Sequence, residues 1–288
     1  MKLRVCNGLL LAFACSAASL EWKDLGNGRL QLLDQGKPAF VYNYGPQLAD
    51  GAPADRKRAS YIYPIYTPSG VSVTDDFPKD HYHHRGVFWA WPVVEIGGGK
   101  KYDLWMMKGG IEDRFERWIT RKASAREAVL ELENGWYADG ARILKETVRI
   151  VAKPAAGKSR ELDITLTLES LTGPITLKGS QEKGKSYGGL SARFAPREQT
   201  SITADSGSVG KDEDLVNHAW AEFTGTYAGG KRASLRIDSD PTNPGGNPQW
   251  CLRYYGFAGA SYPGQSGAIF EKGKPVKLHY KVTLTDLP

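Results

Sequence analysis

Three of the chain's five histidines stand within four positions, in the stretch DHYHHRGVFWAW that covers residues 80 to 91. Asp80 and Arg85 flank the histidines His81, His83 and His84. Imidazole, guanidinium and carboxylate groups bind metal ions, sugars and anions, and histidine also transfers protons near neutral pH. The stretch is therefore the candidate site, and all five side chains are candidate catalytic groups.

A divalent metal ion is one possible occupant of this site. On an extended backbone, His81 and His83 point to one side and His84 to the other, so His81 and His83 are the candidate ligands. A metal needs three or four ligands, and the further candidates by residue type are Asp80, Glu146, His218 and His279. The alternatives are a metal-free polar site for a sugar or a carboxylate, and a purely structural role.

The residues that follow the histidines have two possible uses each. Arg85 could bind a carboxylate or phosphate with two hydrogen bonds, or form a salt bridge with Asp80. Trp89 and Trp91 fall on one face of a strand, where they could stack on a sugar ring as substrate-binding residues or pack in the core. Glu146, in the stretch LKETV, is a further candidate for carrying a proton.

Alternation of polar and apolar residues dominates the rest of the chain. In ELDITLTLES, the apolar side chains Leu162, Ile164, Leu166 and Leu168 alternate with polar ones. Turn signals such as ENG, LTGP and TNPGGNP separate the alternating segments. This pattern predicts an all-β fold, a large antiparallel β-sandwich formed by one domain over residues 19–288. Only residues 212–222 could form a short helix.

The first 18 residues have the pattern of a secretory signal peptide. Lys2 and Arg4 precede a short apolar run and a small-residue cleavage site after Ala18. A lipoprotein attached through Cys15 is the weaker alternative. The sequence thus predicts a secreted or periplasmic protein without a transmembrane segment after cleavage, because no later stretch has about 20 apolar residues in succession.

Charge and cysteine content exclude several classes. The net charge of +6 falls by two without Lys2 and Arg4, and acidic and basic residues are interspersed, so nucleic acid is not an expected partner. Cys251, the one cysteine after the signal, cannot form an internal disulfide and is expected to be a buried thiol. The sequence also lacks a Gly-x-Ser-x-Gly elbow, a phosphate-binding loop, a dinucleotide fingerprint and a His-Glu-x-x-His motif.

Several stretches together resemble a known family. YIYPIYTPSGVSVTDDFPKDHYHHRGVFWAW, LKETVRI, YGGLSARF and WCLRYYGFAGASYPG are similar to motifs of the bacterial methane-oxygenase-PmoA-like family, with Tyr82 in place of its usual proline. The resemblance covers most of the mature chain. It implies a secreted protein with a sandwich like that of galactose mutarotase and a carbohydrate as ligand or substrate. Tyr187, which opens YGGLSARF, is then a further candidate substrate-binding residue.

The resulting hypothesis is a secreted carbohydrate-active protein. A glycoside-processing hydrolase, lyase or epimerase that uses the His/Arg cluster fits best. The alternatives are a non-catalytic carbohydrate-binding sandwich and an oxidase whose metal is held by histidines. Three imidazoles beside a guanidinium favour an enzyme. Burying polar groups without hydrogen-bond partners costs free energy, and proton transfer gives a reason to keep such groups together.

Overall fold

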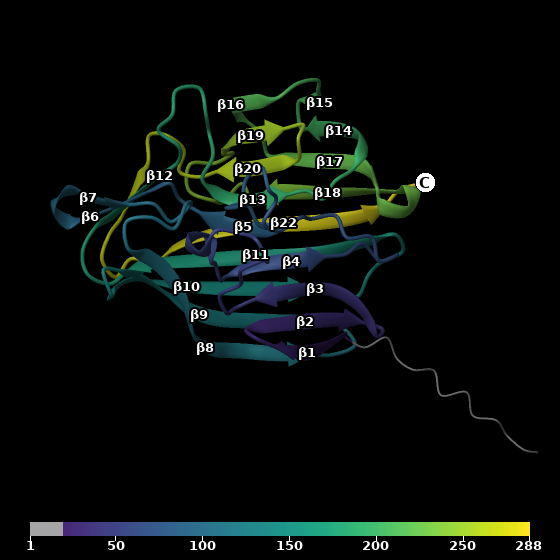
Figure 1. Cartoon of the computed structure of the whole chain (residues 1–288), viewed down its shortest axis with the longest axis horizontal. Helices are drawn as coiled ribbons and strands as arrows, with labels where there is room; N and C mark the ends of the chain where they lie inside the picture. The colour runs from purple at the N-terminus through teal and green to yellow at the C-terminus, as the bar shows by residue number, and fades with distance from the viewer. Residues whose placement is uncertain (1–19) are drawn as a thin grey trace, which may run out of the picture.

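The computed structural model describes residues 20–288, so the predicted signal peptide lies outside the described residues and export remains a prediction. The chain forms two nine-stranded antiparallel sheets, packed face to face, and a small third sheet at one end (Figure 1). The all-β sandwich expected from the alternation is therefore confirmed. No helix in this part of the chain is long and apolar enough to cross a membrane.

The first sheet contains, in spatial order, β1 (Leu20–Gly26), β2 (Arg29–Asp34), β3 (Lys37–Asn43), β4 (Tyr61–Ile65), β5 (Val87–Ala90), β13 (Gly189–Arg193), β20 (Phe257–Ser261), β19 (Gln249–Arg253) and β16 (Glu213–Asn217). The second sheet contains β15 (Gly207–Val209), β14 (Glu198–Ala204), β17 (Trp220–Tyr227), β18 (Lys231–Ser239), β22 (Val276–Asp286), β11 (Ser159–Ser170), β10 (Ala141–Ala152), β9 (Ala128–Ala138) and β8 (Ile111–Ala123). The small sheet contains β21 (Ala268–Phe270), β12 (Ile175–Lys178), β6 (Val93–Ile96) and β7 (Lys100–Tyr102).

Helical structure in residues 20–288 is limited to three short 3₁₀ turns, η1 (Ala54–Arg56), η2 (Gly97–Gly99) and η3 (Ala228–Gly230). The short helix expected within residues 212–222 is wrong, because β16 and the start of β17 occupy this stretch. In β16, Glu213 pairs with Leu252 and Val216 with Trp250. Strand pairing at the sheet edge thus overrides a weak local preference for helix.

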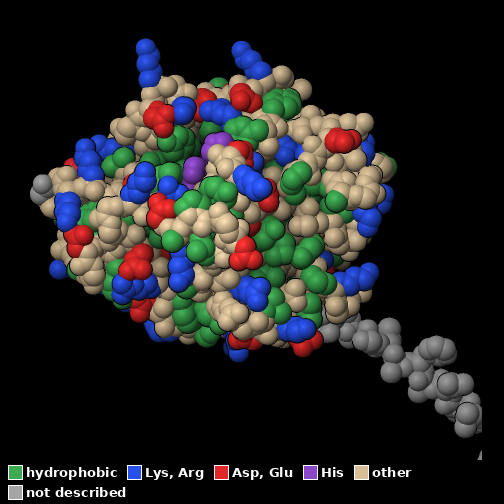
Figure 2. All heavy atoms as spheres, viewed as in Figure 1, with side chains coloured by type: hydrophobic (Ala, Val, Ile, Leu, Met, Phe, Trp, Pro, Cys, Tyr) green, Lys and Arg blue, Asp and Glu red, His purple; other side chains and the backbone are tan. Residues whose placement is uncertain are grey.

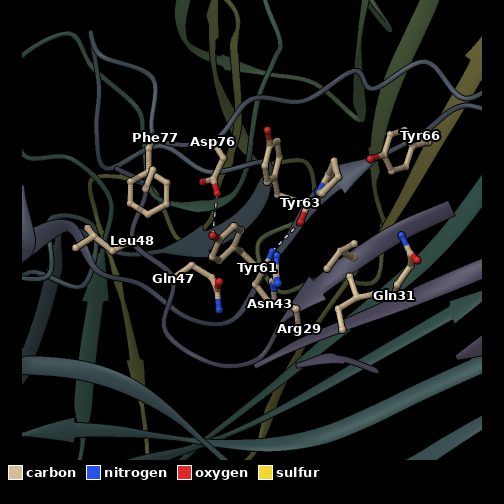
Figure 3. Close-up of a pocket in the computed structure, with 14 residues that line it drawn as sticks. Arg29, Gln31, Asn43, Gln47, Leu48, Tyr61, Tyr63, Tyr66, Asp76 and Phe77 are labelled. Carbon is tan, nitrogen blue, oxygen red and sulfur yellow. Dashed lines mark hydrogen bonds between the residues drawn. The ribbon is translucent and has the colours of Figure 1, made fainter. Parts of the chain in front are cut away.

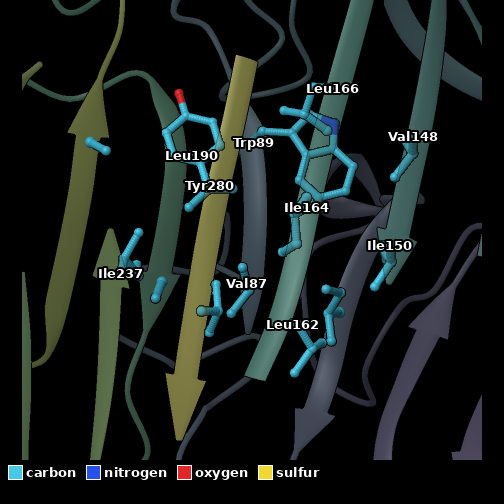
Figure 4. Packing of buried hydrophobic residues seen from close by; sticks show 14 of the residues in the cluster. Val87, Trp89, Val148, Ile150, Leu162, Ile164, Leu166, Leu190, Ile237 and Tyr280 are labelled. Atoms are coloured by element: carbon cyan, nitrogen blue, oxygen red, sulfur yellow. The ribbon is translucent and has the colours of Figure 1, made fainter. Parts of the chain in front are cut away.

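The hydrophobic core lies between the two large sheets. Leu162, Ile164, Leu166 and Leu168 of β11 all point into it, as their spacing predicted. Val87, Trp89 and Leu190 of the first sheet face them (Figure 4). Because strand side chains alternate, the other residues of β5 and its neighbours must lie on the outer face of the first sheet.

One row of cross-strand partners follows that outer face. Tyr61 of β4 pairs with Phe88 of β5, and Phe88 pairs with Ser191 of β13. Ser191 pairs with Gly259 of β20, which pairs with Cys251 of β19. Paired residues share a face, so these five positions form a continuous floor. The buried, unbridged Cys251 expected from the sequence is part of it.

Candidate functional site

The histidines lie on the connection between β4 and β5, which passes over this floor. We call residues 75–86 the histidine loop. Its last residue, Gly86, approaches β4 so closely that a Cβ atom would lie 2.2 Å from the backbone oxygen of Ile62. The absence of a side chain at Gly86 therefore lets the loop pack against β4.

The histidine loop is turned rather than extended. The backbone amide of His81 donates to Pro78 and that of His84 donates to His81, over 2.9 and 2.8 Å. The expectation that His81 and His83 point to one side and His84 to the other is therefore wrong, because a turn between His81 and His84 brings the first and last rings together. These two rings are parallel, with their centroids 4.6 Å apart.

The rings belong to a longer aromatic stack. Tyr255 stacks on the outer side of His81 at 5.1 Å, and Phe257 stacks against His84 at 4.7 Å. The ring of His83 lies edge-on to His84, with a centroid distance of 4.5 Å. The stack fixes the orientation of the imidazoles, since aromatic neighbours on both sides leave little rotational freedom.

Burial and positive neighbours keep two of the histidines uncharged. Burial, followed by the charges of His81 and Arg58, lowers the pKa of His83 to about 3. Burial and the nearby His83 lower the pKa of His84 well below its usual value. His84 is 3% exposed and its Nδ1 has no hydrogen-bond partner in residues 20–288. Neutral imidazoles of this kind can accept a proton.

Asp80 orients His81 and anchors the loop to the sheet. It accepts a 2.9 Å hydrogen bond from His81 Nδ1 and two bonds of 2.9 and 2.8 Å from Arg193 Nη2. Partial burial alone would raise the pKa of Asp80, but the bonds from His81 and Arg193 outweigh it and lower the pKa. Asp80 is thus an ionised group that positions its neighbour.

Arg85 takes neither of the roles that its sequence position suggested. Its side chain is buried and donates to the backbone oxygens of Tyr82 and His84, both at 2.7 Å, and to that of Arg56. Its guanidinium carbon lies 3.4 Å from the ring centroid of Phe77. Arg85 therefore holds the histidine loop in shape, and its remaining donor, Nε, is buried 3.5 Å from Asp76 Oδ1. The pairing expected with Asp80 is made by Arg193 instead.

The histidines line an open cavity of about 550 Å³, here called the histidine pocket. His81, His83 and His84 form one side. The remaining lining residues come from the small-sheet loops and from β19 and β20: Asp103, Trp105, Met106, Glu182, Lys185, Tyr187, Cys251, Arg253, Tyr255 and Phe257. Figure 2 shows histidine side chains within a hollow on this face of the molecule. Of the candidates outside the loop, Tyr187 is thus brought to the histidines.

Tyr187 is held across the pocket by its neighbours. Its hydroxyl donates to Glu182 over 2.7 Å, and its ring packs against Trp105 at 5.0 Å. Partial burial raises the pKa of Tyr187 to about 12, so the hydroxyl keeps its proton at neutral pH. Because its single O–H group donates to Glu182, Tyr187 can donate to a bound molecule by exchanging that hydrogen bond for one to the molecule.

Glu146, Trp89 and Trp91 lie elsewhere. Glu146 is 1% exposed in the core and accepts bonds from Trp89, Trp136 and Asn134 over 3.1, 3.0 and 2.8 Å. Trp91 is fully buried and donates to the backbone oxygen of Tyr262. Neither tryptophan offers a ring face to a sugar, and Glu146 is not at the pocket. These three expectations are corrected because the strand faces involved point inward.

The buried carboxyl of Glu146 should make the protein's stability depend on pH. Burial, followed by the charge of Asp113, raises its pKa from about 4.5 to about 7. The folded protein therefore keeps this proton at a pH where the unfolded chain releases it. The contribution is full below about pH 4.5 and is lost as the pH rises through 7, by roughly 3 kcal/mol in total.

Urea unfolding at pH 5 and pH 8 tests this expectation. Glu146→Gln should lose less stability between the two values than the wild type does, because its side chain does not titrate. Glu161→Gln, an exposed change on the neighbouring β11, should follow the wild type. Equal losses in Glu146→Gln and the wild type would contradict the assignment.

A metal site is not formed by the candidate ligands. Within residues 20–288, no three His, Cys, Asp or Glu side chains have a metal-binding arrangement. The parallel stacking of His81 and His84 explains this locally, because stacked rings do not direct their nitrogens to one point. His218 instead bonds Asp205 and Glu213, and His279 bonds Asp240, in other parts of the fold.

Sequence reasoning missed the residues that complete the pocket. Trp105 lies between the small sheet and the histidines, and Tyr255 and Phe257 lie beside them through strand pairing. The run RYYGF at 253–257 was a signal that could have found two of them, because it places aromatic residues around a glycine. Which of these residues contacts the histidines depends on strand pairing between segments more than 160 residues apart in the sequence.

The structure thus defines an all-β sandwich with a polar, aromatic-lined pocket on the outer face of one sheet. Over residues 29–287 the sequence matches the family model described as "Family of unknown function (DUF6807)", and the chain belongs to this family. The resemblance to the methane-oxygenase-PmoA-like family is therefore corrected, because the matching family is a different one. No curated protein matches the sequence.

Solved structures with a similar fold include carbohydrate-active enzymes. Heparan sulfate lyase HepC from Pedobacter heparinus is 9% identical with a TM-score of 0.42, and the match covers 92% of this chain and 36% of that one. A galactose mutarotase-related enzyme from Lactobacillus acidophilus is 7% identical with a TM-score of 0.40, and the match covers 93% and 97%. The chain spans about a third of the length of the lyase.

Proposed function

We propose that the histidine pocket binds a glycan that contains a uronic acid and breaks a C–H bond of that sugar, as a lyase or an epimerase does. The observation that carries the proposal is His83. Its imidazole is uncharged, lines an open cavity and shares no hydrogen bond within residues 20–288. A proton acceptor with no structural partner, in the same cavity as the protonated hydroxyl of Tyr187, supplies the two groups that proton transfer requires.

The chemistry needs an acidified C–H bond, which a neighbouring carboxylate provides. His83 takes the ring proton, and the electron pair moves toward the carboxylate. Lys185 and Arg253, which are paired with Glu182 and Asp214, line the pocket and stabilise the added charge. In a lyase, this pair then forms a C=C bond as the bond to the neighbouring oxygen breaks, and Tyr187 protonates that oxygen. In an epimerase, Tyr187 returns a proton to the opposite face of the carbon. Solvent then carries the proton from His83 back to Tyr187.

An anionic substrate would also raise the pKa of His83, the proposed base. In the empty pocket, burial and the charges of His81 and Arg58 make His83 a weak base. A bound carboxylate opposes those positive charges, so the pKa of His83 rises toward neutrality only when the substrate is present. The proposal therefore explains why positive groups surround a neutral histidine.

Removing the Tyr187 hydroxyl should slow this reaction without abolishing binding. We expect Tyr187→Phe to lower kcat about 10²-fold, because the ring and its packing remain while the proton donor is lost. Tyr137→Phe is the matched control, since Tyr137 also donates to a glutamate, Glu116, over 2.7 Å, but on the second sheet. Equal kcat values for Tyr187→Phe and the wild type, measured by product chromatography, would remove Tyr187 from the mechanism.

Glycoside hydrolysis is the second candidate, and one observation favours it. Asp103 and Glu182 line the same cavity. Burial raises the pKa of Asp103, whereas hydrogen bonds from Lys185 and Tyr187 lower the pKa of Glu182. Carboxyl groups whose pKa values are pushed apart can act as the acid and the base of a glycosidase. The two candidates differ in whether a sugar C–H bond breaks.

A further inference from the structure

A second pocket lies on the same sheet face, on the other side of the histidine loop. It has a volume of about 450 Å³ and is lined by residues of β2, β3, β4 and the start of the loop (Figure 3). The row of cross-strand partners that passes through Tyr61 continues to Asn43 of β3 and Arg29 of β2. One continuous row of residues on the outer face of the first sheet therefore forms the floor of both pockets, and the histidine loop lies between them.

Asp76 is the acidic residue of this second pocket, which we call the Asp76 pocket. Its side chain is 11% exposed and accepts a 2.9 Å hydrogen bond from the hydroxyl of Tyr61 (Figure 3). Its other oxygen, Oδ1, is buried without a hydrogen-bond partner in the described chain, although Arg85 Nε lies 3.5 Å away. Burial raises the pKa of Asp76 to about 7.

The backbone beside Asp76 is strained. Phe77 has a φ of 51°, in the left-handed region that a bulky side chain rarely adopts. Strain of this kind costs on the order of 1–3 kcal/mol and is kept mainly where the surrounding structure needs the conformation. Here it places the carboxyl of Asp76 toward the pocket and the ring of Phe77 under the guanidinium of Arg85.

The rest of the lining has the composition of a sugar site. Tyr63 and Tyr66 supply aromatic surface, and Gln31 supplies an amide that can donate and accept hydrogen bonds. The Gln47 amide already donates to the backbone oxygens of Asn27 and Gly45, so only its oxygen can accept from a ligand. Gln31 shares no side-chain hydrogen bond with any residue of 20–288, so its amide is free for a ligand. Aromatic surface beside convergent amide and carboxyl groups suits the apolar face and hydroxyl rim of a pyranose.

We propose that the Asp76 pocket is a second, separate binding site, which takes an uncharged pyranose through hydrogen bonds from its hydroxyls to Asp76 and Gln31. Whenever the carboxyl group of Asp76 is ionised it repels an anionic sugar, whereas an uncharged sugar can bind either form of the carboxyl. The site is independent of the chemistry proposed for His83. It nevertheless includes part of the histidine loop, because Asp76 belongs to that loop and lies 3.5 Å from Arg85.

Calorimetry with uncharged disaccharides tests this site. Cellobiose, xylobiose, lactose and mannobiose are the probes. At least one is expected to bind, and Gln31→Ala should weaken its binding at least tenfold. His83→Gln should leave the affinity within twofold, since that residue lies in the other pocket. Thr165→Ala, a half-buried change on the second sheet, is the control for a general effect of substitution.

Gln31→Ala is the variant chosen for the test. Asp76→Asn would also change the contact between Asp76 and Arg85, so a loss of binding in that variant could not be assigned to the sugar contact alone. Binding of no probe, or binding that Gln31→Ala leaves unchanged, would overturn the proposal. Loss of binding in His83→Gln but not in Gln31→Ala would instead place the uncharged sugar in the histidine pocket. Activity on a uronic-acid glycan is a separate measurement, so either proposal can fail while the other stands.

Discussion

Replacing His83 by glutamine is expected to lower kcat on a uronic-acid glycan by between about 10²- and 10⁴-fold, the range typical for loss of a general base. Glutamine fills a similar space and can still hydrogen-bond, but it cannot take a proton. The glycan's Kd should therefore stay within about tenfold, or ~1.4 kcal/mol. Initial rates and calorimetry on the same glycan measure the two quantities.

The pH profile gives a second readout for the same residue. Because the pKa of His83 in the empty pocket is about 3, kcat/KM should not fall as the pH drops through 6.5, where an ordinary histidine becomes protonated. His279→Gln is the matched control, since His279 lies on β22 of the second sheet. An unchanged kcat in His83→Gln would exclude His83 as the base.

Replacing Arg85 by alanine should cost about 3–5 kcal/mol of the free energy of unfolding, as expected when one partner of a buried ion pair is removed. The change leaves Asp76 without its cation and leaves the backbone oxygens of Tyr82, His84 and Arg56 without a donor. Burial lowers the pKa of Arg85 to about 10, so the guanidinium is still charged at neutral pH. The substitution therefore removes a full positive charge from the folded protein.

Urea unfolding of three variants separates this role from a general effect of losing an arginine. Arg85→Lys should fall between the wild type and Arg85→Ala, because one ammonium group cannot reach all the oxygens that the guanidinium contacts. Arg149→Ala removes a surface pair with Glu131 and should cost at most about 1 kcal/mol. A cost for Arg85→Ala no larger than that for Arg149→Ala would show that the loop is held by other contacts.

Alternation made the sandwich predictable, because one sheet face must be apolar to form a core. The apolar positions of β11, from Leu162 to Leu168, illustrate this. The same rule also explains an error at the neighbouring strand. Glu146 is a polar residue on the inward face of β10, where two indole N–H groups and Asn134 satisfy its carboxyl. Its residue type suggested a site, whereas its position in the alternation indicated the core.

The candidate site was located from the sequence, but its geometry was not. Clustering alone made His81, His83 and His84 the candidates, and the structure places all three on one cavity. Their stacking depends on a turn that starts after Pro78 and on Tyr255, which reaches the loop through sheet pairing. Local sequence could not show that Arg85 faces inward either, since the oxygens of Tyr82 and His84 reach it through the turn of the loop and the third comes from Arg56.

Proton NMR of the reaction in deuterium oxide tests the central claim most directly. With the wild type and a uronic-acid glycan, the signal of the ring C–H bond next to the carboxylate should disappear, through exchange with deuterium in an epimerase or through formation of a double bond in a lyase. His83→Gln should preserve that signal. Cleavage of the glycan with every ring C–H signal retained would indicate hydrolysis, and a bound but unchanged glycan would indicate a binding protein; either result would contradict the proposed proton transfer from carbon.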